Sequence, residues 1–133
     1  MSPSASGHYT PKQIEKYRRQ KYIAQLEKIG KNLFRMFRDG QSTAAKFLER
    51  FDELMARLDA LEKIRLDSEY LRESEAHYRR LHRSLHERSF DDEELDGMRE
   101  SAMSELNRLQ KMKNGSSYKK AKHKERERSD GWE

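Results

Sequence analysis

Three histidines, His77, His82 and His86, lie close together in the sequence, and histidine binds metals and transfers protons near neutral pH. His82 and His86 are four residues apart, so on a helix they share a face, and this spacing suits zinc. Glu75, or a residue of the helix that follows, would have to supply a third ligand. The chain has no cysteine and no His-Glu-x-x-His motif. We therefore predict no metal and no cofactor, with these histidines facing solvent or an interface.

Other catalytic patterns are absent from the sequence. No glycine-rich phosphate loop follows a predicted strand, and serine, histidine and aspartate occur in no recognisable catalytic arrangement. Charged residues make up 40% of the chain and the hydrophobic set only 33%, so narrow apolar seams between helices are expected rather than a deep concave core. We predict that the protein is not an enzyme and has no small-molecule substrate.

The charged residues are arranged in blocks of alternating sign within a net charge of +5. Residues 1–38 carry nine basic and two acidic side chains, and residues 39–75 carry six basic and ten acidic ones. Residues 76–90 have four basic and one acidic side chain, whereas residues 91–105 have one basic and seven acidic ones. Two interpretations follow: the blocks pair with each other between helices, or the basic ones bind phosphates.

Two groups of basic residues are the candidate nucleic-acid contacts. The first lies near the N-terminus, where tyrosines at positions 9, 17 and 22 offer rings for stacking, and it comprises Lys12, Lys16, Arg19 and Lys28. The second lies near the C-terminus and comprises Lys119, Lys120, Lys122 and Lys124. The C-terminal group is interpreted either as a solvated extension or as a nucleic-acid arm or nuclear-import patch.

The elements that position these residues are helices. Thr10 suits an N-cap and Pro11 the first helical position, while Gly40 suits the stop, so a helix is predicted over 11–39. Its apolar seam has helical spacing and comprises Tyr22, Leu26, Ile29, Leu33 and Met36, with Ile23 and Phe37 beside it.

The segment 42–88 contains no proline or glycine, so it is predicted to form one central helix of roughly 70 Å. Its first half carries a dense seam comprising Ala44, Phe47, Phe51, Leu54, Leu58 and Leu61. Beyond Leu61 the seam thins and a sparser stripe begins, comprising Ile64, Leu71, Tyr78 and Leu85. We interpret this change as a change of packing partner along one helix.

A third helix is predicted over 91–113, with Asp91 as N-cap and Glu94 at the third helical position. Its inward residues are expected to be Leu95, Met98, Ala102, Leu106, Leu109 and Met112. The helical domain would then span 11–115, between a flexible leader (1–10) and a basic polar tail (116–133).

The predicted fold class is all-α: a long central helix with two shorter antiparallel helices, as a three-helix bundle or an elongated, coiled-coil-like hairpin. The predicted function is a non-enzymatic protein-interaction or assembly module, self-associating through an exposed stripe comprising Leu48, Met55, Ile64, Leu71 and Tyr78. The alternative is a small nucleic-acid-binding protein. The sequence shows no signal peptide and no membrane span, so a cytoplasmic protein without membrane contact is expected, with nuclear or virus- or phage-associated placement as alternatives.

Overall fold

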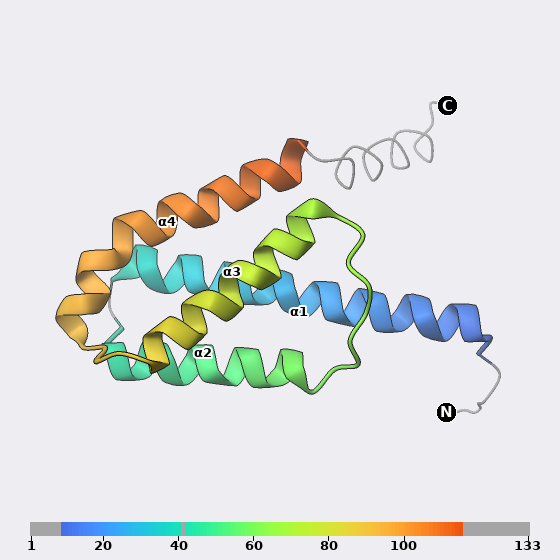
Figure 1. Cartoon of the computed structure of the whole chain (residues 1–133), viewed down its shortest axis with the longest axis horizontal. Coiled ribbons are helices and arrows are strands. Elements are labelled where there is room, and N and C mark those ends of the chain that lie inside the picture. Colours follow the sequence, from blue (N-terminus) through green and yellow to red (C-terminus); the bar gives the residue numbers. More distant parts are fainter. Residues whose placement is uncertain (1–8, 41, 116–133) are drawn as a thin grey trace.

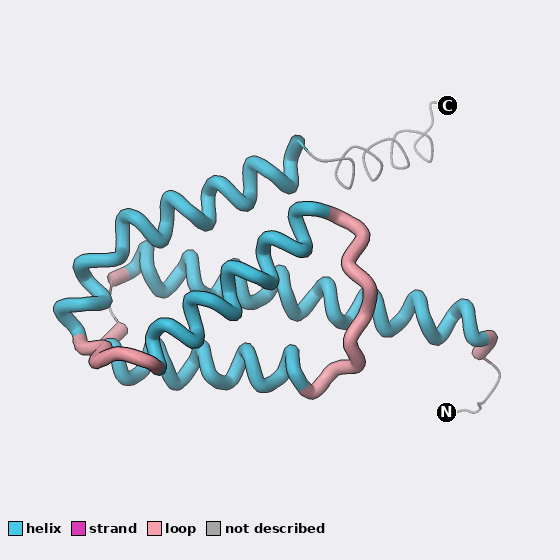
Figure 2. The backbone as a smooth tube through the Cα atoms, viewed as in Figure 1, coloured by secondary structure: helices cyan, strands magenta, loops and turns pink. Residues whose placement is uncertain are grey.

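The computed structural model describes residues 9–40 and 42–115, and these residues are mostly helical. The four helices are α1 (Pro11–Asp39), α2 (Ala44–Asp59), α3 (Glu69–His86) and α4 (Asp92–Gly115). No strand occurs among the described residues, so the predicted all-α fold class is confirmed. Figures 1 and 2 show the other three helices gathered along α1. The predicted tail and all but the last two residues of the predicted leader lie outside the described residues.

The predicted central helix over 42–88 is wrong, because α2 ends at Asp59 and α3 begins only at Glu69. Residues 60–68 form a loop between them, and the chain turns so that α3 packs back on α1 and α2 (Figure 1). Ser68 has an extended backbone at the start of α3, with φ −96° and ψ 137°. The described part of the chain therefore has four helices where three were predicted.

Side-chain burial explains why this segment bends although its residues favour a helix. Folding back buries Leu71, Tyr78 and Leu85, each at most 3% exposed, and burying such a side chain contributes about 1.5–3 kcal/mol. Differences in helix propensity are smaller, below about 1 kcal/mol per residue. Side chains also satisfy two carbonyls of the loop, since the Arg72 guanidinium donates to the Leu66 carbonyl and the Arg19 guanidinium donates to the Arg65 carbonyl, both at 2.9 Å. Burial of the second stripe thus outweighs continuation of the helix.

Three of the predicted helix boundaries are confirmed by local hydrogen bonds or backbone angles. Thr10 and Gln13 form a reciprocal capping box, with N–O distances of 2.9 and 3.1 Å, and Pro11 is the first helical residue. Gly40 ends α1 with a φ of 64°, in the left-handed region that glycine tolerates best. At the start of α4, the Glu94 amide donates to the Asp91 carboxylate at 2.9 Å.

The core combines the two predicted seams with residues from α3 and α4. The α1 seam is buried with one exchange, since Phe37 is buried and Met36 only half-buried. In α2 the predicted seam is buried up to Leu58, while Leu61 is half-buried in the loop. The remaining core residues on α3 and α4 are Tyr70, Leu71, Tyr78, Leu85, Leu95, Ala102, Leu106 and Leu109. No helix among the described residues is long and apolar enough to span a membrane.

The N-terminal end of α1 extends past the other helices, as the blue end of the chain in Figure 1 and the same view in Figure 2 show. Every residue from Pro11 to Arg18 is exposed, and the first buried residue of α1 is Tyr22. α1 is the longest helix with 29 residues, against 16 in α2. The core therefore covers only part of α1, and residues 9–21, called the α1 arm below, are largely left in solvent.

Candidate interaction surface

The stripe that was predicted to mediate self-association is not an exposed surface. Met55, Leu71 and Tyr78 are 3%, 2% and 3% exposed, and Leu48 and Ile64 are half-buried. The physical reason is the turn at residues 60–68, which folds the second half of the stripe into the core of the same chain. The prediction of an exposed seam along the central helix is therefore wrong.

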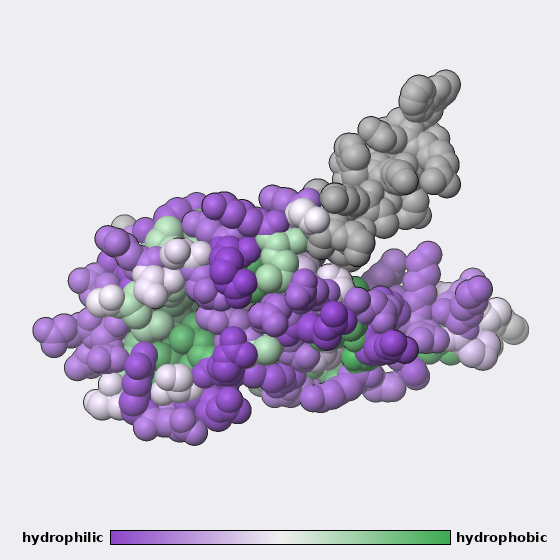
Figure 3. Space-filling view, turned by 45° about the horizontal axis from the view of Figure 1, so that its top comes forward, coloured by the Kyte–Doolittle hydropathy of each residue, from purple (hydrophilic) through white to green (hydrophobic). Residues whose placement is uncertain are grey.

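Among the described residues, the large apolar side chains that are exposed lie instead on the α1 arm. Tyr9, Ile14 and Tyr17 are 73%, 38% and 60% exposed. Figure 3 shows that hydrophilic residues cover most of the face it presents, including most of the projecting end. Two tyrosine rings among basic and glutamine side chains give this end both stacking surfaces and hydrogen-bond donors.

The four candidate nucleic-acid contacts on α1 divide into two kinds. Lys12, Lys16 and Lys28 are exposed, and within the described residues none of them pairs with a carboxylate. Arg19 is engaged: its guanidinium lies 3.3 Å from the Asp67 carboxylate and donates to the Arg65 carbonyl at 2.9 Å. The C-terminal candidates Lys119, Lys120, Lys122 and Lys124 lie outside the described residues.

Further basic residues of α1 are exposed beside Lys12, Lys16 and Lys28. Lys21, Lys31 and Arg35 are also exposed and form no ion pair within the described residues, while the Lys21 ammonium lies 5.1 Å from the Tyr17 ring centre. We call the full set the basic face of α1, although its side chains spread over about half of the helix circumference at 3.6 residues per turn. It comprises Lys12, Lys16, Lys21, Lys28, Lys31 and Arg35. The sequence contains the signal for these additions, because all of them avoid the seam positions of a helix.

The basic face has few acidic neighbours on its own helix. α1 carries three acidic residues, and two are paired: Glu27 with Lys113 at 2.8 Å and Asp39 with Arg38 at 3.1 Å. The predicted pairing between charge blocks occurs, but at only a few positions among the described residues. It comprises Arg19 with Asp67 at 3.3 Å, Arg18 with Glu62 at 3.2 Å, and Arg88 with Glu94 at 3.5 Å. Six cations of α1 thus remain directed to solvent.

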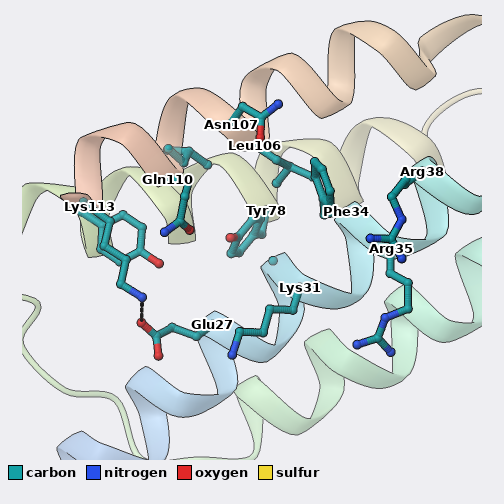
Figure 4. Close-up of a pocket in the computed structure, with 13 residues that line it drawn as sticks. Glu27, Lys31, Phe34, Arg35, Arg38, Tyr78, Leu106, Asn107, Gln110 and Lys113 are labelled. Atoms are coloured by element: carbon teal, nitrogen blue, oxygen red, sulfur yellow. Dashed lines mark ion pairs between the residues drawn. The ribbon is translucent and has the colours of Figure 1, made fainter. Parts of the chain in front are cut away.

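A groove of about 330 Å³ lies where α1 meets α3 and α4, and Figure 4 shows the side chains that line it. Lys31 and Arg35 of the basic face line one side, and Asn107 and Gln110 of α4 line the other. Tyr78 lies between them, and burial raises the pKa of its hydroxyl to about 12, so the phenol stays neutral. The groove therefore joins the basic face to polar groups of α4.

The three histidines, which are close in the sequence, do not form one group in the structure. Glu75 is not their neighbour, because it accepts a hydrogen bond from the Tyr22 hydroxyl and pairs with Arg79 at 3.1 Å. His77 is half-buried and apart from the other two. His82 and His86 share a face of α3 as predicted, and that face meets Asp52 of α2. Sequence reasoning missed Asp52 because only the turn at residues 60–68 brings it there.

No protein-family model matches the chain, and no curated protein or solved structure matches it significantly.

Proposed function

We propose that the protein is a non-enzymatic binding module that holds the phosphate backbone of a nucleic acid along the basic face of α1. One observation carries the proposal: six exposed cations lie on one helix with no carboxylate partner among the described residues. The cations extend from Lys12 to Arg35, which at 1.5 Å per residue is roughly 35 Å. That length is close to one turn of a DNA duplex, about 34–36 Å.

Unpaired cations favour phosphate binding for an energetic reason. A lysine already paired with a carboxylate must give up that pair before it contacts a phosphate, whereas a solvated lysine only has to displace water and counterions. Each contact releases counterions condensed on the nucleic acid, and this release supplies most of nonspecific affinity. The rings of Tyr9 and Tyr17 add stacking surfaces for unpaired bases. Phosphate contacts of this kind position the protein without reading sequence.

The test is fluorescence anisotropy of labelled DNA and RNA, single-stranded and duplex, titrated with the full chain at several salt concentrations. The variant K12Q/K16Q/K28Q should flatten the log–log salt dependence on duplex DNA by about three units, since each contact contributes a slope of about −0.9. The matched control is K46Q/K63Q/K111Q, which removes the same charge from exposed positions outside α1. Circular dichroism checks that both variants keep their helices.

Two results would contradict the proposal. One is the absence of binding at low salt with protein at about 100 μM, the weak end of nonspecific affinities. The other is an equal loss in both triple variants, which would mean that net charge rather than the α1 surface drives association.

A second candidate function is the protein-assembly module, and the exposed Tyr9, Ile14 and Tyr17 favour it. Under this alternative the α1 arm packs on a second copy of the chain, which would cover these three side chains. Light scattering at micromolar concentration should then report more than one chain. The I14S/Y17S variant should return the protein to a monomer, and K12Q/K16Q/K28Q should leave the oligomer unchanged. A monomeric parent protein would exclude self-association through this arm.

A further inference from the structure

Asp52, His82 and His86 form a compact cluster across the contact of α2 and α3. The Nε2 atoms of both histidines lie 2.6 Å from the same Asp52 oxygen, Oδ1. The two imidazole rings are 4.8 Å apart between centres and nearly perpendicular, at 79°. Each residue thus directs one ligand-type atom into a shared space, and these atoms all lie within 4.8 Å of one another.

The cluster is accessible to solvent, and packing restrains one of its side chains. The Asp52 and His86 side chains are each 46% exposed, while His82 is 25% exposed. The Phe51 ring packs edge-on against His82 with centres 4.9 Å apart, which restrains that imidazole. Solvent and small ions therefore reach the shared space from the side of Asp52 and His86.

The separations fit a small divalent ion after a modest adjustment. Zinc binds imidazole nitrogen and carboxylate oxygen at about 2.0–2.2 Å in tetrahedral geometry, so its ligand atoms lie about 3.3–3.5 Å apart. The present N–O separations of 2.6 Å must therefore open by about 0.7–0.9 Å. Rotation of the exposed Asp52 and His86 side chains supplies such a movement without a change in the helices.

We propose that Asp52, His82 and His86 are a binding site for a divalent transition metal of the zinc, cobalt or copper class. Two imidazoles and one carboxylate are a donor set that these ions prefer, whereas magnesium and calcium prefer oxygen ligands. Each histidine coordinates through Nε2 as the neutral Nδ1–H tautomer, so binding releases any proton held on Nε2. Solvent occupies the fourth position.

The site acts as a clamp between α2 and α3. Asp52 lies in the helix before the loop at residues 60–68 and the two histidines lie in the helix after it, so the bound ion links the two sides of that turn. The binding energy is thus added to the folded state, in which the three ligands are brought together. Metal binding at this site does not depend on nucleic-acid binding by α1.

The experiment uses the full chain without a polyhistidine tag. Isothermal titration with Zn²⁺ should give saturable binding of one ion per chain, and Co²⁺ should show the strong visible absorption of a four-coordinate site. H86Q and D52N should each weaken binding about tenfold or more, since even changes in the residues around metal ligands cost 10–100-fold. Circular dichroism checks that both variants remain folded.

Two control variants separate this site from the other histidines of the chain. H77Q alters a histidine on the same helix outside the cluster, and H8Q/H123Q alters two outside the described residues. Both should bind Zn²⁺ like the parent chain. The proposal is overturned by any of three results: no saturable binding up to about 1 mM Zn²⁺, unchanged affinity in H86Q and D52N, or equal loss in H8Q/H123Q.

Discussion

Gly30 lies inside α1 where the end of Tyr78 from α3 meets the helix, and replacing it with alanine tests this contact. A Cβ added at position 30 would overlap the Tyr78 hydroxyl and lie 3.4 Å from Cζ of the same ring. Tyr78 is only 3% exposed, so its ring has little room to withdraw. Gly97 in α4 is the matched control, because a Cβ added there meets nothing within 4 Å.

Helix propensity and overpacking act in opposite directions on the free energy of unfolding of G30A. Alanine is favoured over glycine in a helix interior by about 0.8–1 kcal/mol, and this gain applies at both positions. At Gly30 overpacking against Tyr78 costs about 1–3 kcal/mol in addition. G97A should therefore raise the free energy of unfolding by about 1 kcal/mol, and G30A should fall below G97A by about 1–3 kcal/mol. For a domain of about 100 residues, that difference corresponds to at least about 4 °C in Tm.

The assay is urea denaturation followed by far-ultraviolet circular dichroism, with G30A and Y78F combined in a double-mutant cycle. Removing the Tyr78 hydroxyl should relieve the overlap, so G30A should become stabilising in the Y78F background. The expected coupling energy is about 1–3 kcal/mol. If G30A stabilises the parent chain as much as G97A does, or if the cycle is additive within about 0.5 kcal/mol, the proposed close contact does not exist in solution.

Two further predictions concern the core and its response to acid. Leu58 is fully buried, so L58D should cost several kcal/mol and show as lost helicity or a large drop in Tm, whereas A56D at an exposed position of α2 should remain folded. Burial, opposed by the charge of Glu105, lowers the pKa of His77 below 6.5 in the folded state. The folded protein thus binds this proton more weakly than the unfolded chain, and stability is lost as pH falls below 6.5. The urea concentration at the unfolding midpoint, measured between about pH 5 and 8, should decrease towards acid pH in the parent chain. This decrease should be smaller in H77Q.

Local signals in the sequence were sufficient to predict three of the helix boundaries and most of the core. Thr10, Gly40 and Asp91 mark boundaries through hydrogen bonds or backbone angles that depend on one or two neighbours only. The 3–4 spacing of apolar residues in α1 and α2 predicted buried faces because a helix that packs on one side repeats its contacts at that period. These features need no knowledge of which helix lies opposite.

The turn at residues 60–68 could not be predicted in the same way. Leu61, Ile64 and Leu66 favour a helix, and no glycine or proline interrupts them. What stabilises the turn is distant in sequence: Arg19 of α1 binds the Arg65 carbonyl, and the folded-back α3 buries its own apolar face. The sequence contains one signal of the turn, because the seam thins just beyond Leu61. A change of packing partner and a break in the helix produce the same pattern, however, so this signal does not distinguish them.

The same turn determines both candidate sites. Because α2 stops at Asp59, α3 reverses and brings His82 and His86 onto Asp52, which a continuous helix would have kept about 45–50 Å away from them. The loop at residues 60–68 contacts α1 at Arg18 and Arg19, and the residues of α1 before Arg18 extend into solvent. The predicted long helix would have left the apolar stripe exposed. The observed turn buries most of that stripe and leaves two other surfaces accessible. Their chemistry differs from that of the stripe: one is the proposed metal site, and the other is a group of cations that have no carboxylate partner among the described residues.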